Sequence, residues 1–149
     1  MNRSHLVIGI GSAHGDDQFG WLVADSLSAE SRPEFTVKRA RAPADILSWL
    51  EGASTLTLCD GCRGTGLPGT LRRWNWPNAE IPSTTFLGTH DLGLVSVLEL
   101  AQRLQAIPAQ VWIWGAEARH CAPGANPTDE IRQAAKRAAE EIRKELCPK

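Results

Sequence analysis

Short apolar runs alternate along this chain with segments whose apolar residues recur at helical spacing. The runs Leu6–Ile10 and Val111–Trp114 are continuously apolar, which is typical of strands buried on both faces of a parallel sheet. Parallel neighbours require a crossover connection, and a helix usually supplies it. The alternation therefore predicts an α/β fold, a three-layer α/β/α sandwich with a mostly parallel sheet, in one domain spanning residues 1–149.

Turn residues and periodicity place the remaining elements. Further strands are expected at 35–37, 54–59 and 70–76, and helices are expected to begin at Asp16, Pro43 and His90. The last helix has the clearest pattern, with Asn126 as its cap and Pro127 in its first turn. Its apolar stripe is formed by Ile131, Ala134, Ala135, Ala138, Ile142 and Leu146.

The composition excludes several classes of partner. Lys plus Arg number 16 and Asp plus Glu number 17, so a net charge of −1 offers no long-range field for nucleic acid or an anionic membrane. The apolar runs are much shorter than a membrane span, and the first run, which contains Gly9, is too short for the apolar region of a secretory leader. The 4 cysteines do not form a disulfide framework in a chain of 149 residues. The sequence predicts a cytoplasmic protein with no nucleic-acid or membrane partner.

Three polar residues are expected at one edge of the sheet. Asp17 follows the first strand, Asp60 ends the third strand, and His90 begins a later helix. Ligand sites in such sheets form at the carboxyl ends of the strands. Two carboxylates and one imidazole suit a divalent transition metal that keeps open coordination positions. Each residue also has an ordinary explanation, as a helix-terminal, turn or cap residue.

Two other patterns suggest different functions. The run Gly9–Gly15 resembles a variant dinucleotide fingerprint, but an acidic pair follows it at the position where the pyrophosphate would bind. Cys59 and Cys62 form a Cys-x-x-Cys pattern, but the glycines and proline after them do not allow the helix that activates such a dithiol. A small dithiol oxidoreductase stays open as a hypothesis, although Cys59 is expected to be a buried strand residue.

The acidic pair and the tryptophans carry further expectations. Asp16 is expected to act mainly at the positive end of the following helix, so the substitution Asp16→Asn is expected to be tolerated. Trp112 and Trp114 lie two residues apart on one strand, share a face and are expected to pack in the core or beneath a covering helix. Trp74 and Trp76 share a face in the same way and are expected to offer a partly exposed surface for a peptide.

Three motifs occur in a characteristic order along the chain. The run Gly9–Gly20 contains a Gly-x-Gly loop, an acidic pair and a glycine that leads into the first helix. Cys59-Asp60 places an aspartate at the end of the third strand, and Thr89–Leu94 contains a histidine followed by x-Leu-Gly-Leu. As a set, the motifs cover nearly the whole chain and resemble those of the nickel–iron hydrogenase maturation endopeptidases.

This resemblance implies a specific activity and site. It implies a five-stranded mixed sheet in which the strand at 70–76 runs antiparallel. It also implies a cytoplasmic endopeptidase that removes the C-terminal extension of a hydrogenase large-subunit precursor after nickel insertion, so that the substrate brings the nickel. Nickel contact and catalysis are assigned by the resemblance to Asp17, Asp60 and His90. A non-catalytic nickel-binding chaperone that checks metal loading is the alternative.

The chain departs from the family pattern at two places. Ser12 stands where the family usually has asparagine, and the run 39–43 stands where the family has an acidic, glycine-rich stretch. These departures indicate a divergent subgroup. Arg39 and Arg41 are expected either to pair with acidic groups on the precursor or to form a solvated strand end.

Overall fold

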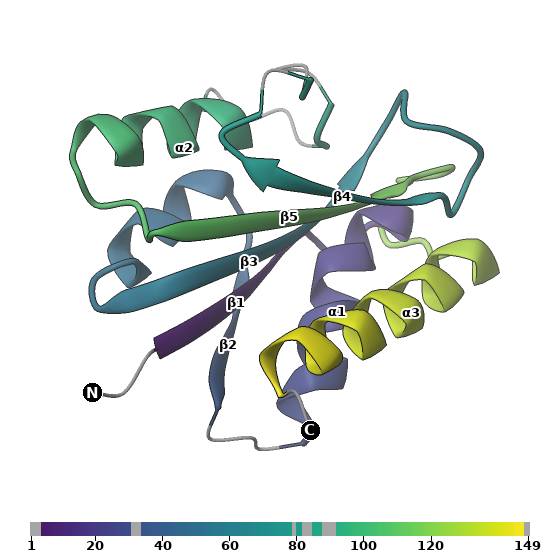
Figure 1. The fold of residues 1–149 in the computed structure, drawn as a ribbon. Helices are drawn as coiled ribbons and strands as arrows, with labels where there is room; N and C mark the ends of the chain where they lie inside the picture. Colours follow the sequence, from purple (N-terminus) through teal and green to yellow (C-terminus); the bar gives the residue numbers. More distant parts are fainter. Residues whose placement is uncertain (1–3, 31–33, 79, 82–84, 88–91, 148–149) are drawn as a thin grey trace.

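The chain forms a five-stranded mixed sheet with the strand order β2-β1-β3-β5-β4 (Figure 1). The computed structural model describes residues 4–30, 34–78, 80–81, 85–87 and 92–147. The strands that run parallel are β1 (Ser4–Ile10), β2 (Phe35–Ala40), β3 (Ala53–Cys62) and β5 (Gln110–Glu117). The edge strand β4 (Leu71–Trp76) pairs antiparallel with β5. The mixed sheet and its antiparallel strand confirm the expected fold class.

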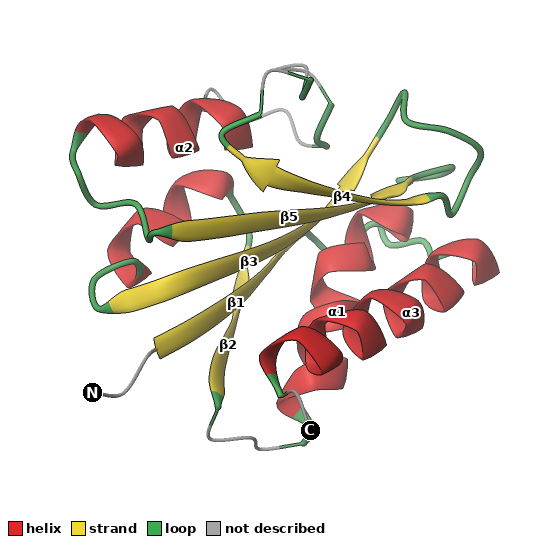
Figure 2. Cartoon of the chain, in the orientation of Figure 1, coloured by secondary structure: helices red, strands yellow, loops and turns green. Residues whose placement is uncertain are grey.

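Helices cover both faces of the sheet (Figure 2). One face carries α1 (Phe19–Ser28) and α3 (Asp129–Leu146), and the other carries α2 (Leu94–Arg103) and the 3-10 helix η2 (Pro43–Trp49). Among the described residues, no helix is both long enough and apolar enough to cross a membrane.

Alternate residues of the central strands supply the two cores, which explains the continuous apolar runs. In β1, Leu6 and Ile8 join the core under α2 and η2, while Val7 joins the core under α1 and α3. In β5, Ile113 and Trp114 divide in the same way. A strand covered on both faces needs apolar side chains at every position. The expected stripe of α3 is confirmed, because its residues from Ile131 to Ile142 pack in the second core.

Two glycines bring α1 directly onto the ends of the strands. A Cβ atom at Gly9 would lie 1.9 Å from the carbonyl oxygen of Gly20 in α1. A Cβ atom at Gly20 would lie 2.3 Å from the carbonyl oxygen of Ile10 and 2.4 Å from that of Cys59. No side chain fits at either position. This close approach places the start of α1, with the acidic pair just before it, beside the end of β3.

Several expected element boundaries are wrong. The acidic pair lies in a short 3-10 helix, η1 (Gly15–Gln18), rather than in an α-helix, and the segment after Pro43 is also 3-10. Helix α2 begins at Leu94 and not at His90, because Gly93 has extended backbone dihedrals (ψ 171°). Thr128, and not Asn126, caps α3 by accepting the Ile131 N–H at 3.4 Å. A residue before proline favours extended backbone, so the helix starts after Pro127.

Strand β3 extends three residues beyond its expected end. It reaches Cys62 because it has backbone partners on both sides there. On one side β5 pairs with it as far as Glu117. On the other side the segment 85–87 runs antiparallel to it: the Leu87 N–H donates to the Gly61 carbonyl at 3.0 Å, and the Arg63 N–H donates to the Thr85 carbonyl at 2.8 Å.

Candidate functional site

Asp60 is a buried carboxyl group without a hydrogen-bond partner in the part of the chain that the structure describes. Its residue is 1% exposed, and neither side-chain oxygen has a hydrogen-bond partner among the described residues. Burial raises its pKa well above the ordinary value of 3.8, and the charge of Asp17 raises it further. The backbone N–H of Gly61 lowers this pKa only in part and forms no hydrogen bond with either oxygen. A carboxyl group in such surroundings requires either a proton or a cation.

Asp17 lies close enough to Asp60 for its charge to act on that carboxyl group. Its side chain is half-buried, and one carboxylate oxygen accepts the hydroxyl of Ser12 at 2.6 Å. The loop between them is closed by its own backbone, since the Ser12 N–H donates to the Asp17 carbonyl at 3.2 Å. A Cβ atom at Gly11 would lie 2.3 Å from that carbonyl, so no side chain fits at this position. The acidic pair that follows this loop continues to disfavour the dinucleotide interpretation.

The third residue of the predicted set, His90, lies outside the described residues. Leu87 lies three positions before it in the sequence, and the Leu87 N–H donates a hydrogen bond to the carbonyl of Gly61, the neighbour of Asp60. Among the described residues, no three His, Cys, Asp or Glu side chains are grouped closely enough to hold a metal. The assignment of Asp17, Asp60 and His90 to one site therefore stays a prediction. Two of its three members, Asp17 and Asp60, are neighbouring carboxyl groups in the structure.

Asp16 has a role that the sequence did not suggest. It is fully buried, and its carboxylate accepts four hydrogen bonds from residues more than a hundred positions away. The backbone N–H groups of Arg119 and His120 donate to one oxygen at 2.7 and 3.2 Å. The N–H and hydroxyl of Thr128 donate to the other oxygen at 2.8 and 2.9 Å. The expectation that Asp16 acts mainly at the helix N-terminus is wrong, because it joins η1 to the loop before α3.

The two cysteines of the Cys-x-x-Cys pattern do not form a redox pair. Both are fully buried within β3, and they project to opposite faces because three positions separate them along a strand. Burial raises the pKa of Cys62 to about 11 and moves the pKa of Cys59 upward as well. The thiolate that redox chemistry needs is therefore disfavoured, and the burial expected for Cys59 is confirmed.

We expect thiol labelling to separate the four cysteines into two groups. Under native conditions a thiol-reactive dye should modify the half-buried Cys121 and Cys147, whereas Cys59 and Cys62 should react only after unfolding. Peptide mapping by mass spectrometry would identify the modified residues. Rapid native labelling of Cys59 or Cys62, or a reversible disulfide between them, would restore the oxidoreductase hypothesis.

Arg39, Arg41 and the tryptophans differ in how far they take part in packing. The Arg39 guanidinium stacks on the Trp21 ring at 3.9 Å and pairs with Asp25 at 3.6 Å. Arg39 therefore already has partners within the protein. Arg41 is exposed. As expected, Trp114 is buried in the core.

The other tryptophans are partly covered. Trp112 is half-buried beneath the guanidinium of Arg73, which lies 3.5 Å from its ring centroid. Trp74 and Trp76 are half-buried against the core under α2.

Glu117 is a structural residue that the sequence analysis missed. Glu117 is the last residue of β5, just as Asp60 lies near the end of β3. An acidic residue at the end of a predicted strand was the signal that could have identified it. Its carboxylate accepts the Thr65 N–H and hydroxyl, both at 2.7 Å, and the Gly64 N–H at 3.1 Å. Burial raises the pKa of Glu117, but the hydrogen bonds from Thr65 and Gly64 outweigh burial and hold the pKa below its usual value. Glu117 thereby fixes the loop that follows β3.

Solved structures share this fold. The nickel–iron hydrogenase maturation protease HycI from Thermococcus kodakarensis matches with a TM-score of 0.76 and 22% identity, covering 97% of this chain and 92% of that chain. The hydrogenase maturating endopeptidase HybD from Escherichia coli has a TM-score of 0.77 at 22% identity, covering 96% and 91%. An endopeptidase from Escherichia coli has a TM-score of 0.78 at 20% identity, covering 95% and 93%. No curated protein sequence matches the chain.

The family assignment rests on a sequence match. The family model described as hydrogenase maturation protease, HycI, matches residues 41–145. The chain belongs to the hydrogenase maturation protease family. It is therefore an endopeptidase that processes a hydrogenase precursor, and the chaperone and oxidoreductase alternatives are not favoured. Asp60 and His90 lie within the matched residues, and Asp17 precedes them.

Proposed function

We propose that this endopeptidase recognises nickel that is already held by its substrate, the precursor of a hydrogenase large subunit, and then removes the C-terminal extension. Asp17, Asp60 and His90 complete the coordination of the substrate's nickel, and no nickel is kept between turnovers. A cytoplasmic location is part of this proposal, because the family that the motifs resemble acts there on newly made precursor.

The unpaired carboxyl group of Asp60 is the observation that carries the proposal. Its two oxygens have no partner among the described residues, and a second carboxylate, that of Asp17, lies close enough to raise its pKa. Carboxylates and imidazole form a donor set that suits a borderline divalent metal. A cation entering with the substrate would offset the cost of burying the charged carboxylate of Asp60 and would screen its repulsion by Asp17.

The same residues have two roles open to them in peptide hydrolysis. As nickel contacts, they would hold the scissile peptide beside the site, and the substrate's metal would polarise the peptide carbonyl or the attacking water. Alternatively, Asp17 or Asp60 would take the proton from that water as a general base, as in an aspartic-type peptidase. The hydroxyl of Ser12 orients Asp17 in either case, because it donates to the carboxylate at 2.6 Å.

We expect nickel-loaded precursor to be cleaved and rigorously nickel-free precursor to be left intact. Two carboxylates and one imidazole leave the coordination sphere incomplete, so the enzyme alone should bind nickel only moderately. The purified enzyme should contain little stoichiometric metal, and chelator should change its melting temperature little. Gel analysis of the large subunit would follow cleavage, and metal analysis would follow the enzyme.

A resident metal would give the opposite pattern. In that case dialysis of the enzyme against chelator would abolish activity, and added metal would restore cleavage even of nickel-free precursor. Cleavage of nickel-free precursor would overturn substrate-borne recognition and leave the family assignment intact. Binding of loaded precursor without any cleavage would instead support a chaperone that checks metal loading.

A further inference from the structure

A row of paired residues leads from Asp60 to the edge of the sheet. Asp60 on β3 pairs with Gly115 on β5, and Gly115 pairs with Arg72 on β4. Residues paired across strands project to the same face, which here is the face covered by α2. Adjacent strands lie about 4.8 Å apart, so the Cα atoms of Asp60 and Arg72 are separated by about 10 Å.

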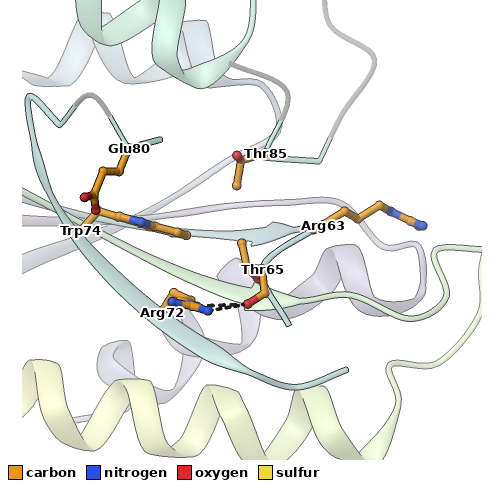
Figure 3. Close-up of a pocket in the computed structure, with 7 residues that line it drawn as sticks. Arg63, Thr65, Arg72, Trp74, Glu80 and Thr85 are labelled. Atoms are coloured by element: carbon orange, nitrogen blue, oxygen red, sulfur yellow. Dashed lines mark hydrogen bonds between the residues drawn. The ribbon is translucent and has the colours of Figure 1, made fainter. Parts of the chain in front are cut away.

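A pocket of about 420 Å³ opens at the outer end of this row (Figure 3). Its side chains come from the loop after β3, from β4 and from the segments that follow β4. They are Arg63, Thr65, Arg72, Trp74, Glu80 and Thr85. The volume is within the range of sites that bury small ligands or single side chains.

The guanidinium of Arg72 is held in place by a backbone carbonyl. Its Nε and Nη2 atoms donate to the Thr65 carbonyl at 3.1 and 2.8 Å (Figure 3). The carbonyl is fixed in turn, because Glu117 holds the backbone and the hydroxyl of Thr65. None of the ion pairs among the described residues involves Arg72. A fixed, unpaired guanidinium with further N–H donors is prepared to bind a carboxylate.

Trp74 supplies a rigid apolar wall. Its ring meets Phe86 edge to face, with ring centroids 5.6 Å apart at 85°. It also covers Gly115, where a Cβ atom would lie 2.9 Å from the Trp74 ring. Glu80 lies at the Trp74 end of the pocket, and Arg63 lies at the opposite end (Figure 3). Two arginines against one glutamate leave the lining with an excess of positive charge.

We propose that this pocket is a substrate subsite that binds a carboxylate of the precursor's C-terminal extension, with Arg72 as its main contact. The inference rests on the proposed function, because it takes Asp60 as the centre of cleavage. Arg72 lies two strands from Asp60 in the same row of the sheet, so the bound carboxylate belongs to a part of the precursor near the cleavage site. An acidic side chain and the terminal α-carboxylate of the extension have the same chemistry, and either fits.

The test compares two enzyme variants on the nickel-loaded precursor. Arg72→Gln removes the charge but keeps an amide donor for the Thr65 carbonyl, and Arg103→Gln removes an exposed charge from the distant end of α2. We expect Arg72→Gln to raise KM at least about tenfold with kcat changed less than twofold. Arg103→Gln should match the wild-type enzyme, and melting curves should show that both variants are folded.

Two precursor variants identify the source of the carboxylate. One has every acidic residue of the extension changed to its amide, and the other has ten neutral residues added at the C-terminus. The variant that lacks the bound carboxylate should raise KM for the wild-type enzyme by the same factor, and Arg72→Gln should then add no further rise. This loss of additivity would not result from a purely structural role of Arg72.

Two results would overturn the subsite. Arg72→Gln could behave like Arg103→Gln, or its effect could add in full to the effects of both precursor changes. The cleavage of loaded precursor by the wild-type enzyme would be retained in both cases, so the proposed function would stand. If the wild-type enzyme left the loaded precursor intact, the proposed function would fail, and the subsite would fail with it.

Discussion

Replacing Asp60 with asparagine is expected to reduce processing of nickel-loaded precursor at least about 100-fold. The substitution removes a carboxylate that has no hydrogen-bond partner among the described residues, so no structural contact is lost with it. The fold should be retained, and the melting temperature at neutral pH should be equal to or above that of the wild-type protein. Glu99→Gln, at an exposed position of α2, is the matched control and should keep full activity.

The pH dependence of the free energy of unfolding should reveal the titration of Asp60. Because folding raises the pKa of Asp60 above its ordinary value of 3.8, the folded state binds this proton more tightly than the unfolded state. The contribution of Asp60 to stability is thus largest below about pH 3.8 and falls as pH rises toward the folded pKa. Urea unfolding of Asp60→Asn should lack this fall. Near-normal cleavage by Asp60→Asn, or identical pH profiles, would contradict the assignment.

Replacing Asp16 with asparagine is expected to lower the free energy of unfolding by about 2–4 kcal/mol. Asparagine offers one acceptor oxygen, and its NH₂ group would face N–H donors that now bind the second oxygen. The donors left without a partner belong to the loop of Arg119 and His120 or to Thr128, and that loop precedes α3. Urea unfolding at pH 7 would measure the loss.

The control for this prediction is Asp129→Asn. Asp129 is also an acidic residue beside a helix N-terminus, but it is exposed, so its loss should cost only about 0.3–1 kcal/mol. If the two variants were equally stable, the buried carboxylate of Asp16 would be acting only on the helix dipole.

Local sequence patterns were sufficient for the layers of the fold. The continuous apolar runs of β1 and β5 indicate strands that are buried on both faces, and the apolar stripe of α3 indicates which side of the helix is buried. The positions of Asp17 after β1 and of Asp60 near the end of β3 followed from the same signals. Boundaries were less accurate where a neighbouring segment decided them, as in the extension of β3 to Cys62 along residues 85–87.

The partners of polar side chains were not accessible in this way. Asp16 and Asp17 are adjacent acids, and nothing local indicates that one is fully buried beneath a loop a hundred residues away while the other stays half-buried. Arg39 and Arg72 are both strand arginines, yet Arg39 stacks on Trp21 and Arg72 lines a pocket. Their surroundings are built by segments that are distant in the chain.

The sequence by itself determined the class of fold, the family motifs and the places along the chain where Asp17 and Asp60 follow or end strands, because hydrophobic periodicity and short motifs are local properties. Only the tertiary structure decided which carboxyl groups are satisfied and which are not. Asp16 meets four donors and Asp60 meets none among the described residues. That difference depends on which backbone N–H groups the folded chain brings within hydrogen-bond distance, and a buried charge is stable only where such donors or a cation are present.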